Sequence, residues 1–225
     1  MKKLNVIITG ATGMVGEGVL HECVLSAEVE NVLIVSRKHY EISNPKVKEV
    51  LVKDFFDLKE LQNHLNASAI KYNTCFFCLG VTSIGKKEDE YTRFTYDLTL
   101  NFGRLLHQLF PEMFFGYISG ASTDSSEKGR MMWARVKGKT ENDLMKLFPN
   151  AYMFRPGYMQ PTKGLKNTIK GYRYVSWMYP FFKIAFRNSV SSLAEMGQAM
   201  INCALHGYEK KILEVKDILK ISHNV

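Results

Sequence analysis

The stretch that decides the fold is Leu4-Asn5-Val6-Ile7-Ile8-Thr9-Gly10-Ala11-Thr12-Gly13-Met14-Val15-Gly16. Its apolar run, Leu4 to Ile8, predicts a buried parallel strand. After the break at Gly10 the apolar residues recur at helical spacing, which predicts a helix with one buried face carrying Val15, Val19, Leu20 and Val24. A strand, a glycine-rich turn and a helix therefore follow one another.

The three glycines of the turn have different tasks. Gly10 permits a tight turn, Gly13 lets the backbone approach a pyrophosphate, and Gly16 lets the helix pack against the strand. The phosphates would lie at the positive N-terminus of the helix, where backbone N–H groups have no partner. The pattern predicts a dinucleotide site that includes Gly10, Thr12, Gly13, Met14, Val15 and Gly16. A glycine-rich turn without a ligand is the alternative.

Composition indicates one soluble globular domain. The chain has 225 residues, of which 46% are hydrophobic and 23% charged, and no linker or repeat divides residues 1–225. The basic start, Met1-Lys2-Lys3, leads into an apolar run too short for a signal peptide, and no stretch of 18 apolar residues predicts a spanning helix. A cytoplasmic protein is expected.

Cysteine and histidine positions do not predict a metal site. Cys75 and Cys78 form a C-x-x-C within an apolar run that reads as a strand, so their side chains should point to opposite faces of a sheet. Zinc or redox chemistry would need the pair on a turn. Buried thiols are expected, and the six histidines are scattered.

Basic residues gather in the last third of the chain. The net charge is +8, and residues 151–225 carry 11 basic and 4 acidic side chains, with no Asp or Glu from Ala151 to Ala194. This favours an anionic partner: a phosphorylated substrate, the cofactor, a membrane surface or nucleic acid. Nucleic acid is the least expected because no binding motif accompanies the charges. A merely solvated basic face is the alternative.

A second buried strand, Asn31 to Ser36, ends in two cations, Arg37 and Lys38. In dinucleotide folds this position faces the adenosine ribose, where an acid binds the 2′-hydroxyl of NAD and an Arg accommodates the 2′-phosphate of NADP. The sequence therefore predicts NADP in preference to NAD. A solvated pair of cations in a turn is the alternative.

Two further strand ends are expected beside the cofactor. A strand from Val47 to Val52 leads to Asp54 and Phe55, which would recognise adenine. Helix capping is the alternative, although Asp57 fits that role better. A strand from Thr74 to Leu79 is followed by Gly80, so Leu79, Gly80 and Val81 should line the cofactor.

Strands and helices alternate over the rest of the chain. We expect a long helix from Glu90 to Phe110, a strand from Phe114 to Ser119, a helix from Gly129 to Leu147, a strand from Ala151 to Phe154 and a short strand at 211–215. This alternation predicts an α/β fold with a doubly wound parallel sheet and right-handed crossovers.

These motifs resemble the short-chain dehydrogenase/reductase superfamily in its extended or atypical branches. Within it, the chain is similar to the NAD(P)H-binding group around the Tat-interacting oxidoreductase-like protein, whose bacterial members are often labelled nucleoside-diphosphate-sugar epimerases. The likeness rests on the glycine turn, the serine-containing end of the fifth strand, Lys137, Phe154-Arg155-Pro156-Gly157, and the segment 189–197, which opens a late helix. It implies a Rossmann fold, cofactor contacts at Lys137 and Pro156, and a substrate-side or lid segment at 157–190.

The resemblance also implies a Ser and a Tyr-x-x-x-Lys pair as catalytic residues. Lys137 is present, and the serine is Ser119 or Ser122, 14 or 11 residues before Trp133. Trp133 occupies the tyrosine position, and an indole N–H cannot act as a general acid near neutral pH. Tyr96 and Tyr158 are other hydroxyl donors, although their spacing does not support that role.

Three functions follow. The first is an NADP(H)-dependent oxidoreductase or epimerase/dehydratase acting on a carbonyl or sugar-nucleotide substrate without the usual tyrosine. The second is an NADP(H)-sensing regulatory protein without catalysis. The third is a peripheral membrane protein that binds through the basic, aromatic region 151–194.

The aromatic run 175–182, which cations flank, indicates an anionic or aromatic small-molecule substrate, although core packing is its plainer interpretation. A monomer or a homodimer paired through its long helices is expected.

Overall fold

A seven-stranded parallel sheet forms the centre of the computed structural model, which describes residues 3–167 and 189–223. The spatial order is β3-β2-β1-β4-β5-β6-β9, so the order reverses between β1 and β4. The strands are β1 (Leu4–Thr9), β2 (Val29–Ser36), β3 (Val47–Leu51), β4 (Thr74–Phe77), β5 (Phe114–Ile118), β6 (Ala151–Arg155) and β9 (Ile212–Glu214). The predicted doubly wound α/β fold is confirmed.

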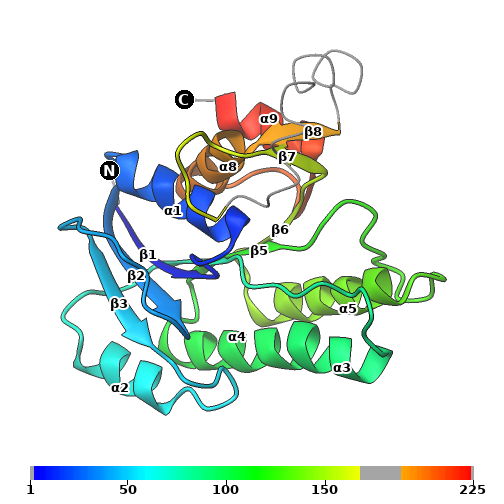
Figure 1. The fold of residues 1–225 in the computed structure, drawn as a ribbon, viewed down its shortest axis with the longest axis horizontal. Coiled ribbons are helices and arrows are strands. Elements are labelled where there is room, and N and C mark those ends of the chain that lie inside the picture. Colours follow the sequence, from blue (N-terminus) through cyan, green and yellow to red (C-terminus); the bar gives the residue numbers. More distant parts are fainter. Residues whose placement is uncertain (1–2, 168–188, 224–225) are drawn as a thin grey trace.

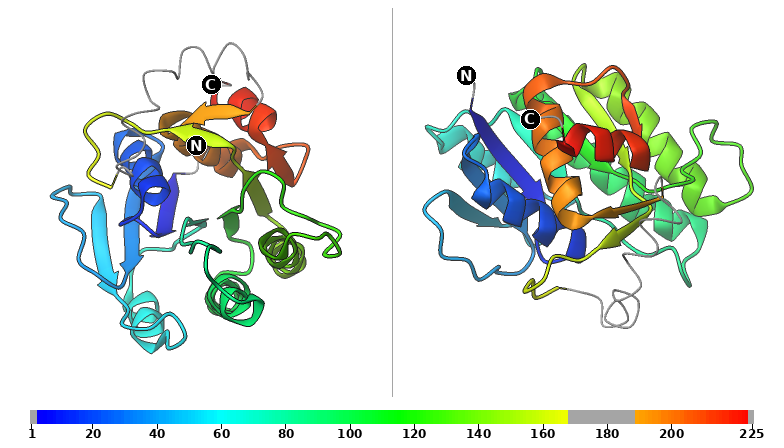
Figure 2. Two further views of the ribbon diagram at one scale, coloured as in Figure 1. Left: turned by 45° about the vertical axis from the view of Figure 1, so that its right-hand side comes forward. Right: turned by 90° about the horizontal axis from the view of Figure 1, so that it is seen from above.

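Helices cover both faces of this sheet (Figures 1 and 2). One face carries α1 (Met14–Leu25), α8 (Leu193–His206) and α9 (Val215–His223); the other carries α2 (Lys59–Ala67), α3 (Glu88–Thr92), α4 (Leu98–Leu109) and α5 (Met132–Leu147). A sheet covered on both sides buries every side chain of its central strands, which is why those strands read as continuous apolar runs.

Successive residues of a strand supply two separate cores. Val6, Ile8 and Phe76 pack under α1 and α8, whereas Ile7 and Phe77 pack with the helices of the other face. Cys75 belongs to the second core and Cys78 lies against the first, as predicted from their spacing. Burial raises the pKa of both thiols, so neither is a ready nucleophile or metal ligand.

β4 is shorter than the predicted strand, because it ends at Phe77 and not at Leu79. Beyond Phe77 the chain leaves the sheet and runs beside the glycine turn. The backbone N–H of Leu79 donates to the Thr9 hydroxyl at 3.3 Å, and a Cβ on Gly10 would lie 2.7 Å from the carbonyl carbon of Cys78. Residues Cys78 and Leu79 therefore pack against the glycine turn and not against a neighbouring strand.

The expected regular helix from Glu90 to Phe110 is interrupted. α3 ends at Thr92, a π-helical turn (η1) spans Arg93–Asp97, and α4 follows. Side chains of the π turn make contacts in two directions. Phe94 meets Phe56 edge to face at 6.3 Å between ring centroids, and the Tyr96 hydroxyl donates to Asp143 on α5 at 2.8 Å. The helix predicted from Gly129 begins at Met132.

The segment after β6 forms a second, small sheet. β7 (Tyr158–Gln160) and β8 (Val190–Ser192) pair in parallel, and Ser192 then caps α8 through a capping box with Glu195. The expected late helix is thus present. Of the predicted lid at 157–190, residues 168–188 lie outside the described residues, and so does the aromatic run 175–182. Among the helices that the structure describes, none has both the length and the apolarity to span a bilayer.

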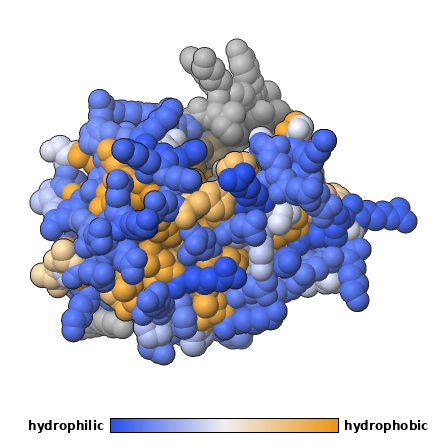
Figure 3. All heavy atoms as spheres, turned by 90° about the horizontal axis from the view of Figure 1, so that it is seen from below, coloured by the Kyte–Doolittle hydropathy of each residue, from blue (hydrophilic) through white to orange (hydrophobic). Residues whose placement is uncertain are grey.

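The face formed by α2, α4 and α5 mixes hydrophilic and apolar side chains (Figure 3). Half-buried apolar residues of α4 and α5, among them Leu105, Leu109 and Met145, contribute to it. Pairing of two copies through these helices stays a prediction.

Candidate functional site

The glycine turn separates glycines that the fold requires from one that it does not. Gly10 has a φ of +74°, and a Cβ on Gly16 would lie 2.2 Å from the carbonyl oxygen of Gly10. Both are therefore fixed by the packing of the turn itself. Gly13 precedes α1 with a φ of −105°, and a Cβ there would meet only Gly10 O at 3.4 Å. Its missing side chain leaves room for a ligand at the helix N-terminus.

Two adjacent cavities open from this turn along the carboxyl ends of the strands. The first, about 170 Å³, extends from Gly10 and Thr12 past the end of β2. The second, about 290 Å³, continues between the ends of β3 and β4. Both are lined by Arg37, Phe55 and Leu79, so they form one groove; the first also touches Lys38, and the second touches Lys53, Asp54, Phe56, Gly80, Val81, Lys86, Phe94 and Leu98.

The structure therefore brings together most of the predicted cofactor residues. Gly10, Thr12, Arg37, Asp54, Phe55, Leu79, Gly80 and Val81 all line this groove. Gly13, Met14, Val15 and Gly16 lie in the adjoining turn and at the start of α1. Lys137 and Pro156 do not line it; Pro156 lies farther along the sheet edge, where its carbonyl accepts the N–H of Ala121 at 2.8 Å.

The groove is cationic with aromatic walls. Arg37, Lys53 and Lys86 line the larger cavity, and Arg93 stacks over Phe56 at 5.1 Å from the ring centroid. Two nearby carboxylates are already engaged. Glu49 accepts the Ser36 hydroxyl at 3.1 Å and the Tyr40 N–H at 2.9 Å. Asp54 accepts the Phe56 N–H at 2.9 Å, whereas Asp57 accepts the N–H of the first residue of α2.

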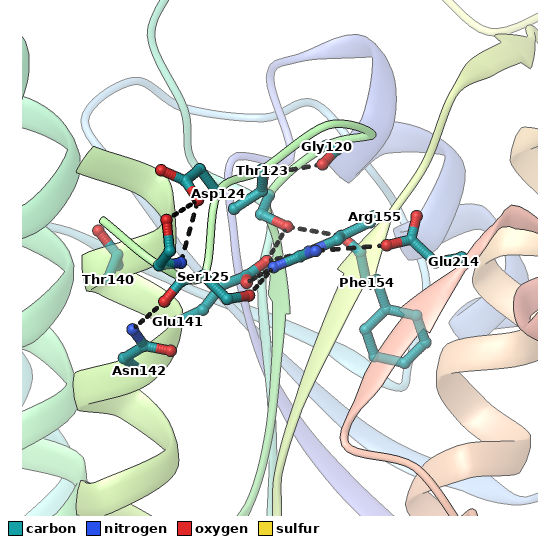
Figure 4. A network of polar contacts seen from close by, with 12 residues as sticks. Gly120, Thr123, Asp124, Ser125, Thr140, Glu141, Asn142, Phe154, Arg155 and Glu214 are labelled. Atoms are coloured by element: carbon teal, nitrogen blue, oxygen red, sulfur yellow. Dashed lines mark hydrogen bonds and ion pairs between the residues drawn. The ribbon is translucent and has the colours of Figure 1, made fainter. Parts of the chain in front are cut away.

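A buried network of charges lies at the carboxyl ends of β5 and β6 (Figure 4). The Glu141 carboxylate, on α5, has no exposed surface and accepts from the Ser119 hydroxyl and from Nε and Nη2 of Arg155. Arg155 also donates to Ser125 Oγ at 2.6 Å and to Glu214 Oε1 at 3.3 Å. Each buried charge thus has an opposite charge and several hydrogen bonds, as burial requires.

This network gives the two candidate serines different surroundings. Ser119 is 5% exposed, and its hydroxyl donates inward to Glu141, so its proton is committed within the protein. Ser122 lies exposed on the loop after β5, with a φ of +67°. Only Ser122 has a hydroxyl that reaches solvent.

Lys137 lies on the face of α5 that carries Trp133 one turn before it and Glu141 one turn after it. Its ammonium donates to the carbonyl oxygen of Ser119 at the end of β5. Among the described residues, no carboxylate lies within 4.0 Å of that ammonium. Burial lowers the pKa of Lys137 to about 8, and the negative charge of Glu141 opposes that shift.

The loop between β5 and α5 is held tightly against this helix. A Cβ on Gly138 would lie 1.8 Å from the carbonyl oxygen of Asp124, so α5 touches the loop backbone directly. The Asp124 carboxylate accepts from the Ser126 hydroxyl at 2.6 Å and from the Gly129 N–H at 2.6 Å. These bonds, that from Ser126 foremost, lower the pKa of Asp124. The loop backbone is therefore held against α5 at Gly138.

The two tyrosines considered as substitute donors have other partners. Tyr96 donates to Asp143 on the outer side of α5, and burial raises its pKa to about 12. Tyr158 donates to Gln160 Oε1 at 3.0 Å within β7. Neither arrangement places a hydroxyl beside Lys137.

The sequence did not predict the roles of three of the buried charged residues, Glu17, Glu141 and Arg155. Glu17, in the first turn of α1, accepts the backbone N–H groups of Lys166 and Asn167 at 2.9 and 2.7 Å. It thereby ties the chain beyond β7 to the helix of the glycine turn. A signal existed, since Glu141 follows Lys137 by four residues and Arg155 ends an apolar strand. Their partners lie far away in the sequence, so the local pattern did not identify them.

In the part of the chain that is described, no three His, Cys, Asp or Glu side chains gather as a metal site.

Comparison with known proteins supports this fold. No family model and no curated protein sequence matches the chain. Among solved structures, ADP-L-glycero-D-manno-heptose-6-epimerase of Helicobacter pylori matches with a TM-score of 0.63 and 12% identity, over 98% of this chain and 82% of that one.

Two more solved structures match over most of the chain. A short-chain dehydrogenase/reductase of Saccharomyces cerevisiae gives a TM-score of 0.64 at 13% identity, over 95% of this chain and 96% of that one. The Bordetella bronchiseptica enzyme WbmF, in complex with NAD⁺, gives 0.62 at 13%, over 98% and 76%. The chain shares an α/β Rossmann fold with these proteins.

Proposed function

We propose that the chain is an NADP(H)-dependent oxidoreductase or epimerase of the short-chain dehydrogenase/reductase type. The observation that carries the proposal is the position of Gly13, where a side chain is absent without a packing reason, in the turn beside a groove lined by Arg37 and other cations. A pyrophosphate fits the first position, and an adenosine with a 2′-phosphate fits the second. When bound, NADP(H) would supply or accept a hydride.

The residues present divide the binding task. The start of α1 would hold the pyrophosphate with backbone N–H groups, and Phe55 with Leu79 would enclose the adenine. Arg37 would bind the 2′-phosphate, because the exposed guanidinium ends β2 at the place where an acid would favour NAD. Lys137, on α5 with its ammonium at the end of β5, would face the nicotinamide ribose. The substrate is expected to be a carbonyl compound or sugar nucleotide; its anionic or aromatic character stays a prediction.

The test is a titration of the protein with NADPH and with NADH, followed by nucleotide fluorescence. NADPH should bind at least tenfold more tightly. Arg37→Ala should weaken NADPH binding about 10- to 100-fold, the loss of one or two charge-assisted hydrogen bonds, and change NADH binding less than threefold. Lys59→Ala, which removes a cation from the start of α2, is the matched control. Equal affinity for the two nucleotides, or no effect of Arg37→Ala, would refute the NADP assignment.

A second function, NADP(H) sensing without catalysis, is favoured by two observations: Trp133 occupies the tyrosine position, and the Ser119 hydroxyl is committed to Glu141. It predicts tight NADPH binding, no oxidation by any carbonyl compound, and gain of reductase activity in Trp133→Tyr. Membrane association through 151–194 stays a prediction, since residues 168–188 of that region lie outside the described residues.

A further inference from the structure

We propose that the Lys137 ammonium itself supplies the proton to the substrate oxygen, in the role that a tyrosine hydroxyl would otherwise have. The proposal rests on the proposed oxidoreductase function and deepens it. Three features of the surroundings of Lys137 support this role.

The first feature is position. The ammonium bonds to the carbonyl oxygen of Ser119, at the carboxyl end of β5. In open α/β sheets ligands bind at the carboxyl ends of the strands, and β5 lies beside β4, whose end leads into the cofactor groove. Lys137 is therefore on the edge of the sheet where a reacting group would lie.

The second feature is the lack of an ion-pair partner. An ammonium has three N–H donors, and one is used by Ser119 O. The nearby carboxylate, Glu141, is occupied by Arg155 and by the Ser119 hydroxyl. In the described ranges no acid lies within 4.0 Å of Lys137 Nζ. A half-buried cation with two donors to spare is explained by a ligand oxygen better than by packing.

The third feature is the elimination of the neighbouring donors. Trp133 offers an indole N–H that can form a hydrogen bond but cannot lose its proton near neutral pH. Ser119 directs its hydroxyl into the buried network, and Tyr96 bonds to Asp143. The Ser122 hydroxyl is exposed, but an aliphatic hydroxyl does not lose its proton near neutral pH. The lowered pKa of Lys137, about 8, then permits the ammonium to give and regain a proton under ordinary conditions.

In the reduction of a carbonyl group, the carbon gains the hydride that NADPH carries, and the C=O π electrons move to the oxygen. The oxygen takes one proton from Lys137 Nζ, which becomes a neutral amine and keeps its bond to Ser119 O. Water returns a proton to the amine before the next turnover. The oxidation runs the same transfers in reverse.

The experiment compares Lys137→Arg with wild type. Arginine keeps a cation and donors for a ribose but does not deprotonate. With NADPH bound and 4-nitrobenzaldehyde as the probe, single-turnover oxidation of NADPH should fall at least 100-fold in Lys137→Arg, as for loss of a general acid, while the Kd for NADPH stays within threefold. Lys139→Arg, two residues further on the exposed side of α5, should change neither.

A second readout does not depend on turnover. Acetylation of the intact protein by acetic anhydride across pH, followed by mass spectrometry, should give Lys137 a midpoint near pH 8, and the single-turnover rate should follow the same ionisation. A midpoint at the ordinary lysine value of 10.5 would overturn the proposal. Full activity in Lys137→Arg would also overturn it, because the lysine would then act only as a ribose-binding cation.

Trp133→Tyr separates the remaining outcomes. If the wild type binds NADPH without oxidising it and Trp133→Tyr oxidises it, Lys137 does not fill the tyrosine's role and the proposal is wrong. If NADPH does not bind at all, the proposed function fails first. The two failures are thus distinguished by the binding measurement.

Discussion

Replacing one member of the buried Glu141–Arg155 pair tests the physical account of the region behind the candidate site. Glu141→Leu would leave the guanidinium of Arg155, which is 8% exposed, with Ser125 and Glu214 as its partners. Arg155→Leu would leave the Glu141 carboxylate, which has no exposed surface, without its bound cation. We expect each change to lower the free energy of unfolding, and Arg155→Leu to lower it more.

The magnitude follows from the burial of both charges. Removing one partner of a buried pair costs about 3–5 kcal/mol, because the other charge stays buried without compensation. For a chain of this size each kcal/mol shifts the Tm by about 2–4 °C, so a fall of about 6–20 °C is expected. The double variant, with two apolar side chains, should lose less than either single variant, because no charge is then left alone.

Wild type, the two single variants and the double variant form a double-mutant cycle, whose stabilities are measured by thermal and urea unfolding. Lys146→Ala is the control, since Lys146 pairs with Asp143 on the exposed side of the same helix, and its midpoint should not move measurably. Additive losses in the cycle, or single variants as stable as wild type, would show that the pair does not compensate two buried charges.

Two further predictions concern the site itself. Gly13→Ala should fold with a Tm close to that of wild type but bind NADPH at least tenfold more weakly, whereas Gly16→Ala should lose stability, since its Cβ would lie 2.2 Å from Gly10 O; equal loss of stability in both would contradict the separation of roles. The lowered pKa of Lys137 means that the unfolded chain binds an extra proton between pH 8 and 10.5, so this group makes the free energy of unfolding rise with pH across that interval, by up to about 3 kcal/mol. The free energy of unfolding, measured by urea titration at several pH values in this range, should rise with pH more steeply in wild type than in Lys137→Met. The same pH dependence in both proteins would contradict the prediction.

The alternation of apolar runs and helical patterns predicted the sheet well, because central parallel strands are buried on both sides and leave a plain signal. The late helix α8 followed from the resemblance of segment 189–197 to the segment that opens a late helix in short-chain dehydrogenases/reductases. The groove residues were predicted because strand ends in this fold meet at one edge. These features could be predicted because each depends on residues that are close together in the sequence.

Other features depend on contacts that no local pattern contains. β4 ends early because the glycine turn approaches Cys78, and the Ser119 hydroxyl turns inward because Glu141 and Arg155 meet behind it. The spacing of Ser119 and Ser122 left the two equivalent, and only the network distinguishes them. A buried charge in an apolar stretch is a local signal that a partner exists, but it does not identify that partner.

The π turn at Arg93–Asp97 sets the rotational phase between the two helices that it joins. A π-helical turn holds one residue more than an α-helical turn, and each α-helical residue advances the side-chain direction by about 100°. The same residues wound as regular α-helix would therefore turn α4 by about that angle relative to α3. Phe94 would then leave the groove wall, or Tyr96 would lose Asp143, because one straight helix cannot satisfy both. The π turn thus lets the continuous segment from α3 to α4 place Phe94 in the groove wall and Tyr96 against Asp143 of α5.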